Sequence, residues 1–200
     1  VKKKLFFWAL DLGMNYKPYK ENGFFYEFKL KIARKLIFSK WQEALGGELE
    51  LLVSGSAALQ PRLARIFAAA EIPVMEGYGL TETSPVITVN DMRNFGFRVG
   101  TVGRVLDNVD VKIAEDGEIL VKGPNVMKGY YKDPDKTNEV MSGDYFHTGD
   151  IGDIDTDGFL KITDRKKRHV QNVRRKICSA NIIGKSIKTI TFYRTNNGHR

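Results

Sequence analysis

The sequence is poor in the features that mark secreted, disulfide-bonded or membrane-spanning proteins. One cysteine among 200 residues excludes an internal disulfide framework and favours a reducing compartment. No apolar run reaches the length that spans a bilayer, and no signal-peptide pattern follows Val1. We therefore expect a cytoplasmic protein. Hydrophobic residues make up 42% of the chain, which is enough for a packed core and argues against wholesale disorder.

Acidic residues are absent from residues 168–200, which hold 8 Lys and Arg. Residues 1–167 hold 24 basic and 24 acidic residues, so the whole net charge of +8 comes from this tail. A strongly positive chain indicates a nucleic-acid partner when the charge covers a folded face. Here a neutral body carries a basic tail, and we expect no nucleic acid to bind.

Apolar residues recur at helical spacing in residues 1–16 and again from Phe28 to Leu45, where Gly46-Gly47 ends the run. Both predicted helices are basic on their polar sides, as is typical of a solvated face. A weak contact with the inner face of a membrane is the alternative.

Two short apolar runs, Leu49–Val53 and Ile72–Met75, flank a helix predicted from Pro61 to about Ala70. This strand–helix–strand order predicts an α/β fold with a parallel sheet. Each run stops at a glycine-containing segment, first Ser54-Gly55-Ser56 and then Glu76-Gly77-Tyr78-Gly79. We expect turns there, at the strand ends where ligands collect.

The pattern changes after Gly100. Residues 109–114 and 118–122 alternate around Asp116-Gly117, and residues 151–154 and 159–162 flank Asp157-Gly158. Such dipeptides between alternating segments predict tight hairpins. An antiparallel β subdomain therefore follows the parallel part.

The segment from Gly77 to Thr83 carries the densest chemistry. Its glycines permit close approach of a ligand, and the Tyr78 ring can stack on a base. Thr81 offers a hydroxyl to phosphate oxygens, and Glu82 offers a carboxylate to Mg²⁺. A capped helix start explains the same residues, and spacing alone does not choose between the two.

A second cluster is Phe146-His147-Thr148-Gly149-Asp150. Asp150 can accept two hydrogen bonds from a ribose diol, although a plain Asx turn is the simpler interpretation. We expect His147 to be structural, because no nucleophile lies near it in the sequence. A third cluster, residues 164–167, has the composition of a solvated charge run.

Taken in order, these blocks resemble the acid-adenylating enzymes, and the resemblance covers residues 1–167. Gly117-Glu118-Ile119 and Gly129-Tyr130-Tyr131 belong to the same series. The sequence is most similar to the long-chain fatty acid–CoA ligases, through stretches such as Leu52-Val53-Ser54-Gly55. The resemblance implies that residues 1–163 are the C-terminal portion of the large N-terminal AMP-binding domain, and that residues 164–167 are a hinge.

The resemblance also implies a two-step reaction and a set of site residues. A fatty acid carboxylate would attack the α-phosphate of ATP, and the thiol of CoA would then displace AMP, with Mg²⁺ offsetting charge. Gly55, Ser56 and Ala57 would line the adenine and acyl pocket, within a nucleotide site that includes Gly77 and Gly79. Tyr78 would stack on adenine, and Asp150 would bind the ribose with Arg165 nearby. Two residues would be catalytic: Thr81 would contact the α-phosphate, and Glu82 would bind the metal. Asp164 would be the hinge about which the C-terminal domain rotates.

Two departures from the family pattern stand out. A phosphate-binding loop is expected before Val1, and a Lys-Thr-Ser-Gly-Gly-Lys stretch is expected after Lys167. Reading the codons of residues 168–180 one nucleotide later yields Asp-Met-Phe-Lys-Thr-Ser-Gly-Gly-Lys-Tyr-Val-Ala-Pro. An extra base in a run of A encoding residues 166–168 would explain the tail. Gene sequencing tests this, and an A-run of the in-frame length with the same tail would contradict it.

We therefore expect a frame-shifted tail at residues 168–200 in place of the start of the lid domain, with a divergent basic tail as the alternative. The lid lysine that assists adenylation would lie beyond Arg200, so we expect the chain to be inactive alone. Two other functions stay open: another acid-adenylating enzyme, and a non-catalytic nucleotide-binding module with a basic tail.

Overall fold

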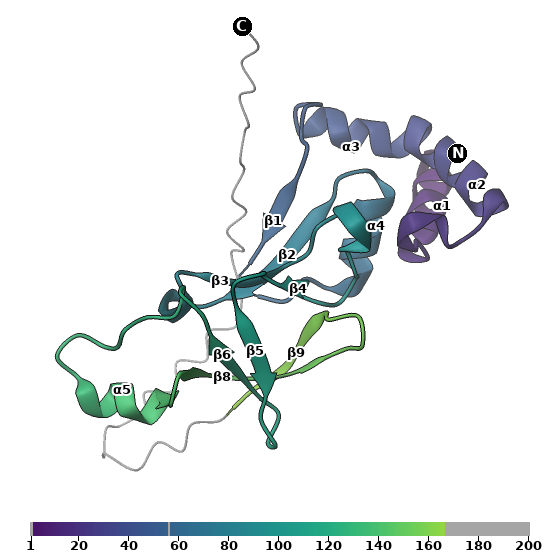
Figure 1. The fold of residues 1–200 in the computed structure, drawn as a ribbon. Helices are drawn as coiled ribbons and strands as arrows, with labels where there is room; N and C mark the ends of the chain where they lie inside the picture. The colour runs from purple at the N-terminus through teal and green to yellow at the C-terminus, as the bar shows by residue number, and fades with distance from the viewer. Residues whose placement is uncertain (1, 56, 167–200) are drawn as a thin grey trace, which may run out of the picture.

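A computed structural model describes residues 2–55 and 57–166 (Figure 1). The N-terminal part is helical, with α1 at Lys2–Met14, a 3₁₀ turn at Pro18–Lys20, α2 at Phe24–Ala33 and α3 at Ser39–Ala44. A π-helical turn at Arg34–Phe38 joins α2 to α3. Both predicted helical segments are confirmed, and the second begins earlier than predicted, at Phe24.

The second helical segment ends as predicted at Gly46-Gly47. Both glycines have positive φ, 96° and 75°. Their N–H groups donate to the carbonyl oxygens of Glu43 at 3.0 Å and Gln42 at 2.8 Å, which satisfies acceptors that the helix end leaves unpaired. The chain then turns toward the first sheet.

The first sheet has the order β1-β2-β3-β4. Its strands are β1 at Leu52–Ser54, β2 at Val74–Gly79, β3 at Val86–Val89 and β4 at Arg104–Val105, and helix α4 at Pro61–Ala69 connects the first two. β1 and β2 are parallel, as predicted. β3 and β4 add antiparallel, so among the described residues the parallel part is a single strand pair.

The predicted turn at Glu76-Gly77-Tyr78-Gly79 is wrong. These residues belong to β2, and Gly77, Tyr78 and Gly79 pair with β3. The glycines serve close backbone approach, because a Cβ on Gly79 would lie 1.6 Å from the carbonyl oxygen of Pro85. The first strand is also shorter than predicted, since only residues 52–54 of that region are extended.

Helices α1, α2 and α4 cover the core of the first half. Ala9, Leu30, Ala33, Ala69 and Phe38 are fully buried there. α1 packs closely on α4, because a Cβ on Gly13 would lie 3.2 Å from the Cα of Ile66.

The second sheet has the order β5-β6-β8-β7, with β9 paired to β8. Its strands are β5 at Asp110–Ile113, β6 at Glu118–Lys122, β7 at Met141–Ser142, β8 at Tyr145–Ile154 and β9 at Leu160–Arg165, and helix α5 at Pro134–Val140 precedes β7. All pairings are antiparallel. Both predicted hairpins are confirmed, with turns at Asp116-Gly117 and Asp157-Gly158, and so is the α/β class.

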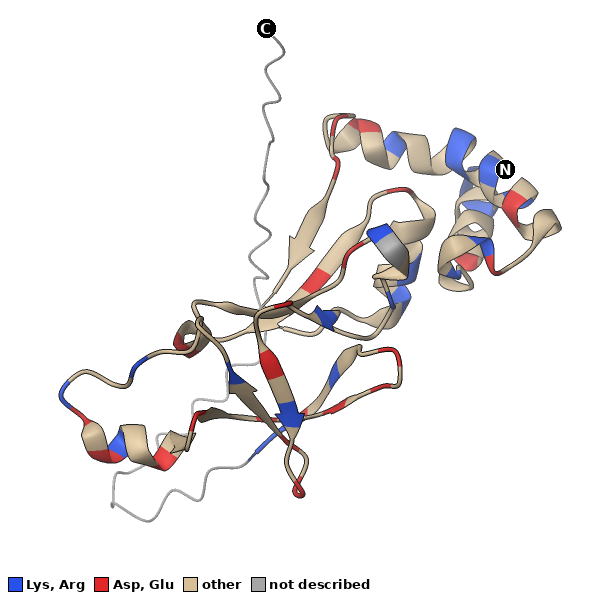
Figure 2. Ribbon diagram, viewed as in Figure 1, with Lys and Arg blue, Asp and Glu red and all other residues tan. Residues whose placement is uncertain are grey.

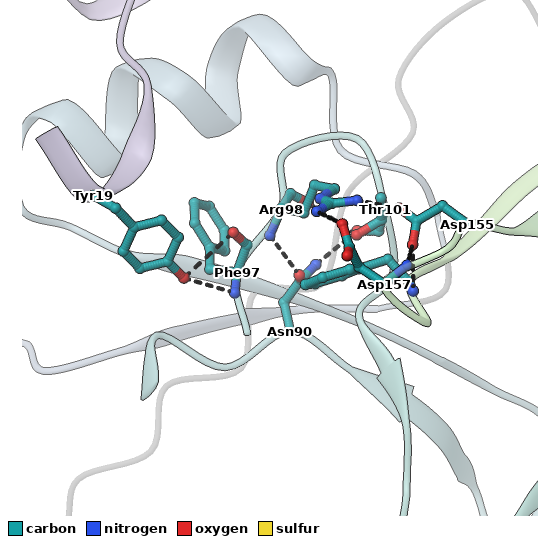
Figure 3. Close-up of polar contacts among 8 residues, drawn as sticks. Tyr19, Asn90, Phe97, Arg98, Thr101, Asp155 and Asp157 are labelled. Atoms are coloured by element: carbon teal, nitrogen blue, oxygen red, sulfur yellow. Dashed lines mark hydrogen bonds and ion pairs between the residues drawn. The ribbon is translucent and has the colours of Figure 1, made fainter. Parts of the chain in front are cut away.

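A loop between β3 and β4 ties the helical half to the second sheet (Figure 3). The Arg98 guanidinium pairs with Asp155 and, at 2.6 Å, with Asp157 in the β8–β9 turn. Buried Asn90 holds this loop in shape, because it accepts from the N–H of Arg98 at 3.0 Å and donates to the carbonyl of Thr101 at 2.7 Å. The loop thereby fixes the second sheet against the end of the first.

Candidate functional site

A cavity of about 860 Å³ opens where the carboxyl ends of β1 and β2 meet β8 and β9. Most of the residues singled out from the sequence line it, although they come from five separate strands, turns and loops. They are Ala57, Gly77, Tyr78, Gly79, Thr81, Glu82, Asp150, Asp164 and Arg165. Gly55 directly follows the lining residue Ser54, which is the last residue of β1, whereas Ser56 and residues 168–200 lie outside the described residues.

Tyr78 and Asp150 meet at the edge of this cavity. The Tyr78 hydroxyl donates to Asp150 Oδ2 at 2.8 Å across 72 residues of sequence. The tyrosine is only 9% exposed and packs with Ile87, Ile119 and Leu160. Burial raises the pKa of Tyr78 well above its ordinary value, so the hydroxyl keeps its proton and remains a donor. The contact joins the two sheets at the cavity.

Asp150 is held in the middle of β8. Its side chain is 15% exposed, and Arg165, its partner across the β8–β9 ladder, places Nε 3.7 Å from Asp150 Oδ1. Gly149 precedes it with φ of +73°, a conformation that favours glycine. A partly exposed carboxylate with one oxygen already bonded can still accept hydrogen bonds from a ligand.

Thr81 and Glu82 lie in a 3₁₀ turn at Thr81–Thr83 directly after β2. Thr83 Oγ1 accepts from the N–H of Leu80 at 2.9 Å, so this is a capped helical start. The same turn lines the cavity, and the structural and ligand-binding interpretations of these residues are therefore compatible.

Glu82 also faces a smaller hollow of about 430 Å³. Its Oε1 accepts from the Tyr130 hydroxyl at 2.9 Å, and Lys136, Arg165 and Lys166 share the walls. Among residues 2–55 and 57–166, no group of three or more His, Cys, Asp or Glu could hold a metal ion. A single carboxylate fits Mg²⁺ that takes its other ligands from phosphate oxygens and water.

His147 does not line either hollow. Its Nδ1 lies 2.9 Å from Glu118 Oε2, in agreement with the structural role expected for it. Glu118 is the residue that sequence reasoning missed. Its carboxylate is buried and also contacts Gly149 and Lys166, but an acid beside a predicted hairpin carries no local sign of burial.

The family model described as AMP-binding enzyme matches residues 18–131, more than half of the chain. The protein fadD11 of Mycobacterium tuberculosis is 47% identical over 153 residues, which cover 75% of this chain and 26% of that protein. The long-chain-fatty-acid–CoA ligase FadD15 of the same species is 38% identical over 72% of this chain and 24% of its own length. The long chain acyl-CoA synthetase 3 of Arabidopsis thaliana is 38% identical, with coverages of 84% and 27%.

Solved structures share the fold. MatB from Rhodopseudomonas palustris is 39% identical with a TM-score of 0.53, over 58% of this chain and 25% of its own. The o-succinylbenzoate CoA synthetase MenE from Bacillus subtilis, solved in complex with ATP and magnesium ion, is 28% identical with a TM-score of 0.53, over 63% and 30%. The chain spans about a quarter of the length of the curated relatives it matches. With a family match over more than half its residues, and relatives 38% identical to it that match 72% and 84% of its length, the chain belongs to the AMP-binding enzyme family.

Proposed function

We propose that the protein activates a long-chain fatty acid with ATP and passes the acyl group to CoA. The carboxylate displaces pyrophosphate from the α-phosphate, and the thiolate then displaces AMP. Support comes from two relatives named as long-chain ligases or synthetases, which match 72% and 84% of this chain.

One observation carries the proposal: the contact between the Tyr78 hydroxyl and the Asp150 carboxylate at the cavity edge. It places the ring that would stack on adenine beside the carboxylate that would bind the ribose hydroxyls. The remaining carboxylate oxygen is left for the ribose diol, with Arg165 near it. In this proposal Gly55 and Ala57 flank adenine and the acyl group, and Gly77 and Gly79 keep the strand beside the nucleotide free of side chains.

Thr81 and Glu82 serve the phosphates in this proposal. The Thr81 hydroxyl donates a hydrogen bond to the α-phosphate. Glu82 holds Mg²⁺, which neutralises charge on the phosphates. The Tyr130 hydrogen bond orients the Glu82 carboxylate, as partners of metal-binding carboxylates commonly do. CoA is the second substrate.

The domain division follows the same proposal. Residues 1–163 belong to the large domain, and Asp164 is the pivot of the hinge. That the chain has no turnover alone also stays a prediction. ATP–pyrophosphate exchange with palmitate tests it, and measurable exchange would refute it.

Calorimetric titration of the chain with AMP and with ATP tests the nucleotide site, each with and without Mg²⁺. We expect Mg²⁺ to tighten ATP binding and leave AMP binding unchanged. Asp150→Asn should weaken both nucleotides about tenfold or more, the effect of losing a hydrogen bond to a charged group. Glu82→Gln should weaken only ATP with Mg²⁺. Equal binding of ATP and GTP, or no effect of Asp150→Asn, would refute the proposal.

The acid itself is the least supported part, because the similar MenE structure belongs to an enzyme named for o-succinylbenzoate. Binding of stable adenylate analogues of palmitate and of o-succinylbenzoate compares the two classes. We expect the palmitoyl analogue to bind more tightly. The reverse order would assign the chain to the other acid-adenylating enzymes. If neither analogue binds and the chain binds DNA at moderate salt, the result would favour a nucleotide-binding module with a basic tail.

We further propose a cytoplasmic protein with weak contact to the inner membrane face. No helix among the described residues is long and apolar enough to cross a membrane. Phe24 and Phe25 at the start of α2 are 79% and 82% exposed, and Lys and Arg are frequent on the neighbouring helices (Figure 2). Aromatic and cationic side chains together favour an anionic lipid surface. Co-sedimentation with anionic but not neutral vesicles is expected, and its loss in Phe24→Ser/Phe25→Ser tests the contact.

A further inference from the structure

Glu118 is a buried carboxylate to which the proposed reaction gives no role. It lies at the start of β6 and is 4% exposed. Burial alone raises the pKa of a carboxyl group, but contacts with His147, Lys166 and the N–H of Gly149 outweigh burial and hold the pKa of Glu118 below its ordinary value. It is therefore a charged group kept inside the protein, and buried charges are retained where they are paired.

The partners of Glu118 come from β8 and from the residue that directly follows β9. Oε1 accepts from the N–H of Gly149 at 2.9 Å, and Oε2 accepts from Lys166 Nζ at 2.8 Å. The N–H of Lys166 in turn donates to the carbonyl oxygen of Gly149 at 2.8 Å. These three contacts form a closed ring in which both the backbone N–H and the backbone carbonyl of Gly149 are held.

The ring lies next to the two residues proposed to face the ribose. Gly149 directly precedes Asp150, and Lys166 directly follows Arg165. Asp150 and Arg165 are opposite one another across the β8–β9 ladder, close to an irregularity at Ile151 and Gly152. The ladder alone is interrupted there, so a second constraint is needed to keep this end in register.

The strand that carries Glu118 also holds this part of β8 through its next residue, Ile119. Thr148 Oγ1 donates to the carbonyl oxygen of Ile119 at 2.8 Å and accepts from the N–H of Asp150 at 3.1 Å. The backbone on both sides of Gly149 is thus anchored to β6. Of the two anchors, only Glu118 also reaches the segment after Arg165.

We propose that Glu118 is a positioning residue of the ribose site, which holds Asp150 and Arg165 together through the Gly149 backbone and the Lys166 ammonium. This proposal rests on the proposed function, because it takes Asp150 as the group that binds the ribose hydroxyls. Glu118 itself touches no substrate.

The first test is discrimination of the ribose diol, measured as the ratio of dissociation constants for 2′,3′-dideoxy-AMP and AMP. In Glu118→Ala we expect this ratio to fall at least fivefold, toward that of Asp150→Asn. Glu118→Gln keeps an oxygen for Gly149 and loses one of the two charges that attract Lys166, the other being Asp116, whose Oδ2 lies 2.5 Å from Lys166 Nζ. The ratio of Glu118→Gln should therefore lie between those of the wild type and Glu118→Ala. Asp144→Asn is the matched control, because Asp144 pairs with Lys122 at 2.7 Å on the same sheet and is exposed.

The second test is amide hydrogen exchange of the nucleotide-free chain. Glu118→Ala should speed exchange of the Gly149 amide at least tenfold. The Leu160 amide, which donates to Gly103, should not change. If Glu118→Ala does not fold, Glu118→Gln supplies both readouts, with a smaller effect on Gly149.

Three outcomes distinguish failure of this proposal from failure of the proposed function. A wild-type ratio near one would refute ribose binding by Asp150, and with it both proposals, whatever Gly149 exchange shows. A high wild-type ratio that Glu118→Ala and Glu118→Gln both retain would refute only the positioning role. Equal weakening of AMP and dideoxy-AMP in the variants would show a merely structural residue and would also overturn it.

Discussion

Replacing Gly79 by alanine should destabilise the fold, although alanine is the smallest change available. A Cβ at this position would lie 1.6 Å from the carbonyl oxygen and 2.6 Å from the carbonyl carbon of Pro85, and 2.9 Å from the Cα of Val86. Real Cβ atoms essentially never approach other heavy atoms closer than 3.0 Å. The start of β3 must therefore move by more than 1 Å from β2.

The cost of that movement has two parts. Overpacking of a tight site costs about 1–3 kcal/mol, and weakening the Gly79–Val86 ladder pair costs about 1 kcal/mol for a backbone hydrogen bond. We expect Gly79→Ala to lower the free energy of unfolding by about 2–4 kcal/mol. Urea unfolding measures the change, with the signal monitored by circular dichroism at roughly 222 nm. This band reports helices, which make up much of the first half.

Gly55→Ala is the matched control. No heavy atom lies within 4 Å of a Cβ built there, and its φ is not positive. Such a substitution changes stability by less than about 1 kcal/mol, often favourably. A Gly79→Ala variant within about 0.5 kcal/mol of the wild type would refute the close-approach explanation. Loss of AMP affinity in stable Gly55→Ala would support a ligand at β1.

Two further predictions concern buried polar groups. Asn90→Ala leaves the N–H of Arg98 and the carbonyl of Thr101 without their partner and should lower the free energy of unfolding in urea by about 2–4 kcal/mol. The control is Asn138→Ala at an exposed position, which should change stability by less than about 0.5 kcal/mol. Equal effects of the two substitutions would contradict the role of Asn90. The pKa of Tyr78 is raised in the fold, so its stabilisation is complete below pH 10.0, the ordinary tyrosine value, and is lost as pH rises above it. Tyr78→Phe should therefore reduce the loss of stability above pH 10.0 by up to about 1.4 kcal/mol per pH unit, and an unchanged slope in the variant would contradict the assignment.

Local signals in the sequence predicted the end of the second helical segment and both hairpins. Asp116-Gly117 and Asp157-Gly158 specify tight turns by their own conformational preferences, and Gly46-Gly47 ends a helix in the same way. Such features depend on a few neighbouring residues, so one sequence is enough to find them. The parallel pairing of β1 and β2 also followed from the order of elements.

Long-range packing decided what the sequence could not reveal. Gly77 and Gly79 suggested a turn, but β3 returns against them and uses the missing side chains for strand contact. Glu118 belongs to one of the blocks that carry the family resemblance, but nothing in the sequence indicated its partners, because Gly149 and Lys166 are 31 and 48 residues away. The candidate site was found by the resemblance of ordered motifs, and the structure then brought most of those residues to one cavity.

The central claim is that AMP binds in the cavity between the two sheets. Mapping the backbone amide shifts of the isotope-labelled chain during titration with AMP tests it most directly. We predict shifts at Gly55, Gly79, Asp150 and Arg165 that follow a single dissociation constant, and we expect that constant to rise about tenfold or more in Asp150→Asn. Another open hollow, of about 810 Å³, is lined by residues that include Asp110, Lys122 and Met141. Shifts confined to that hollow, or none at all, would contradict the account.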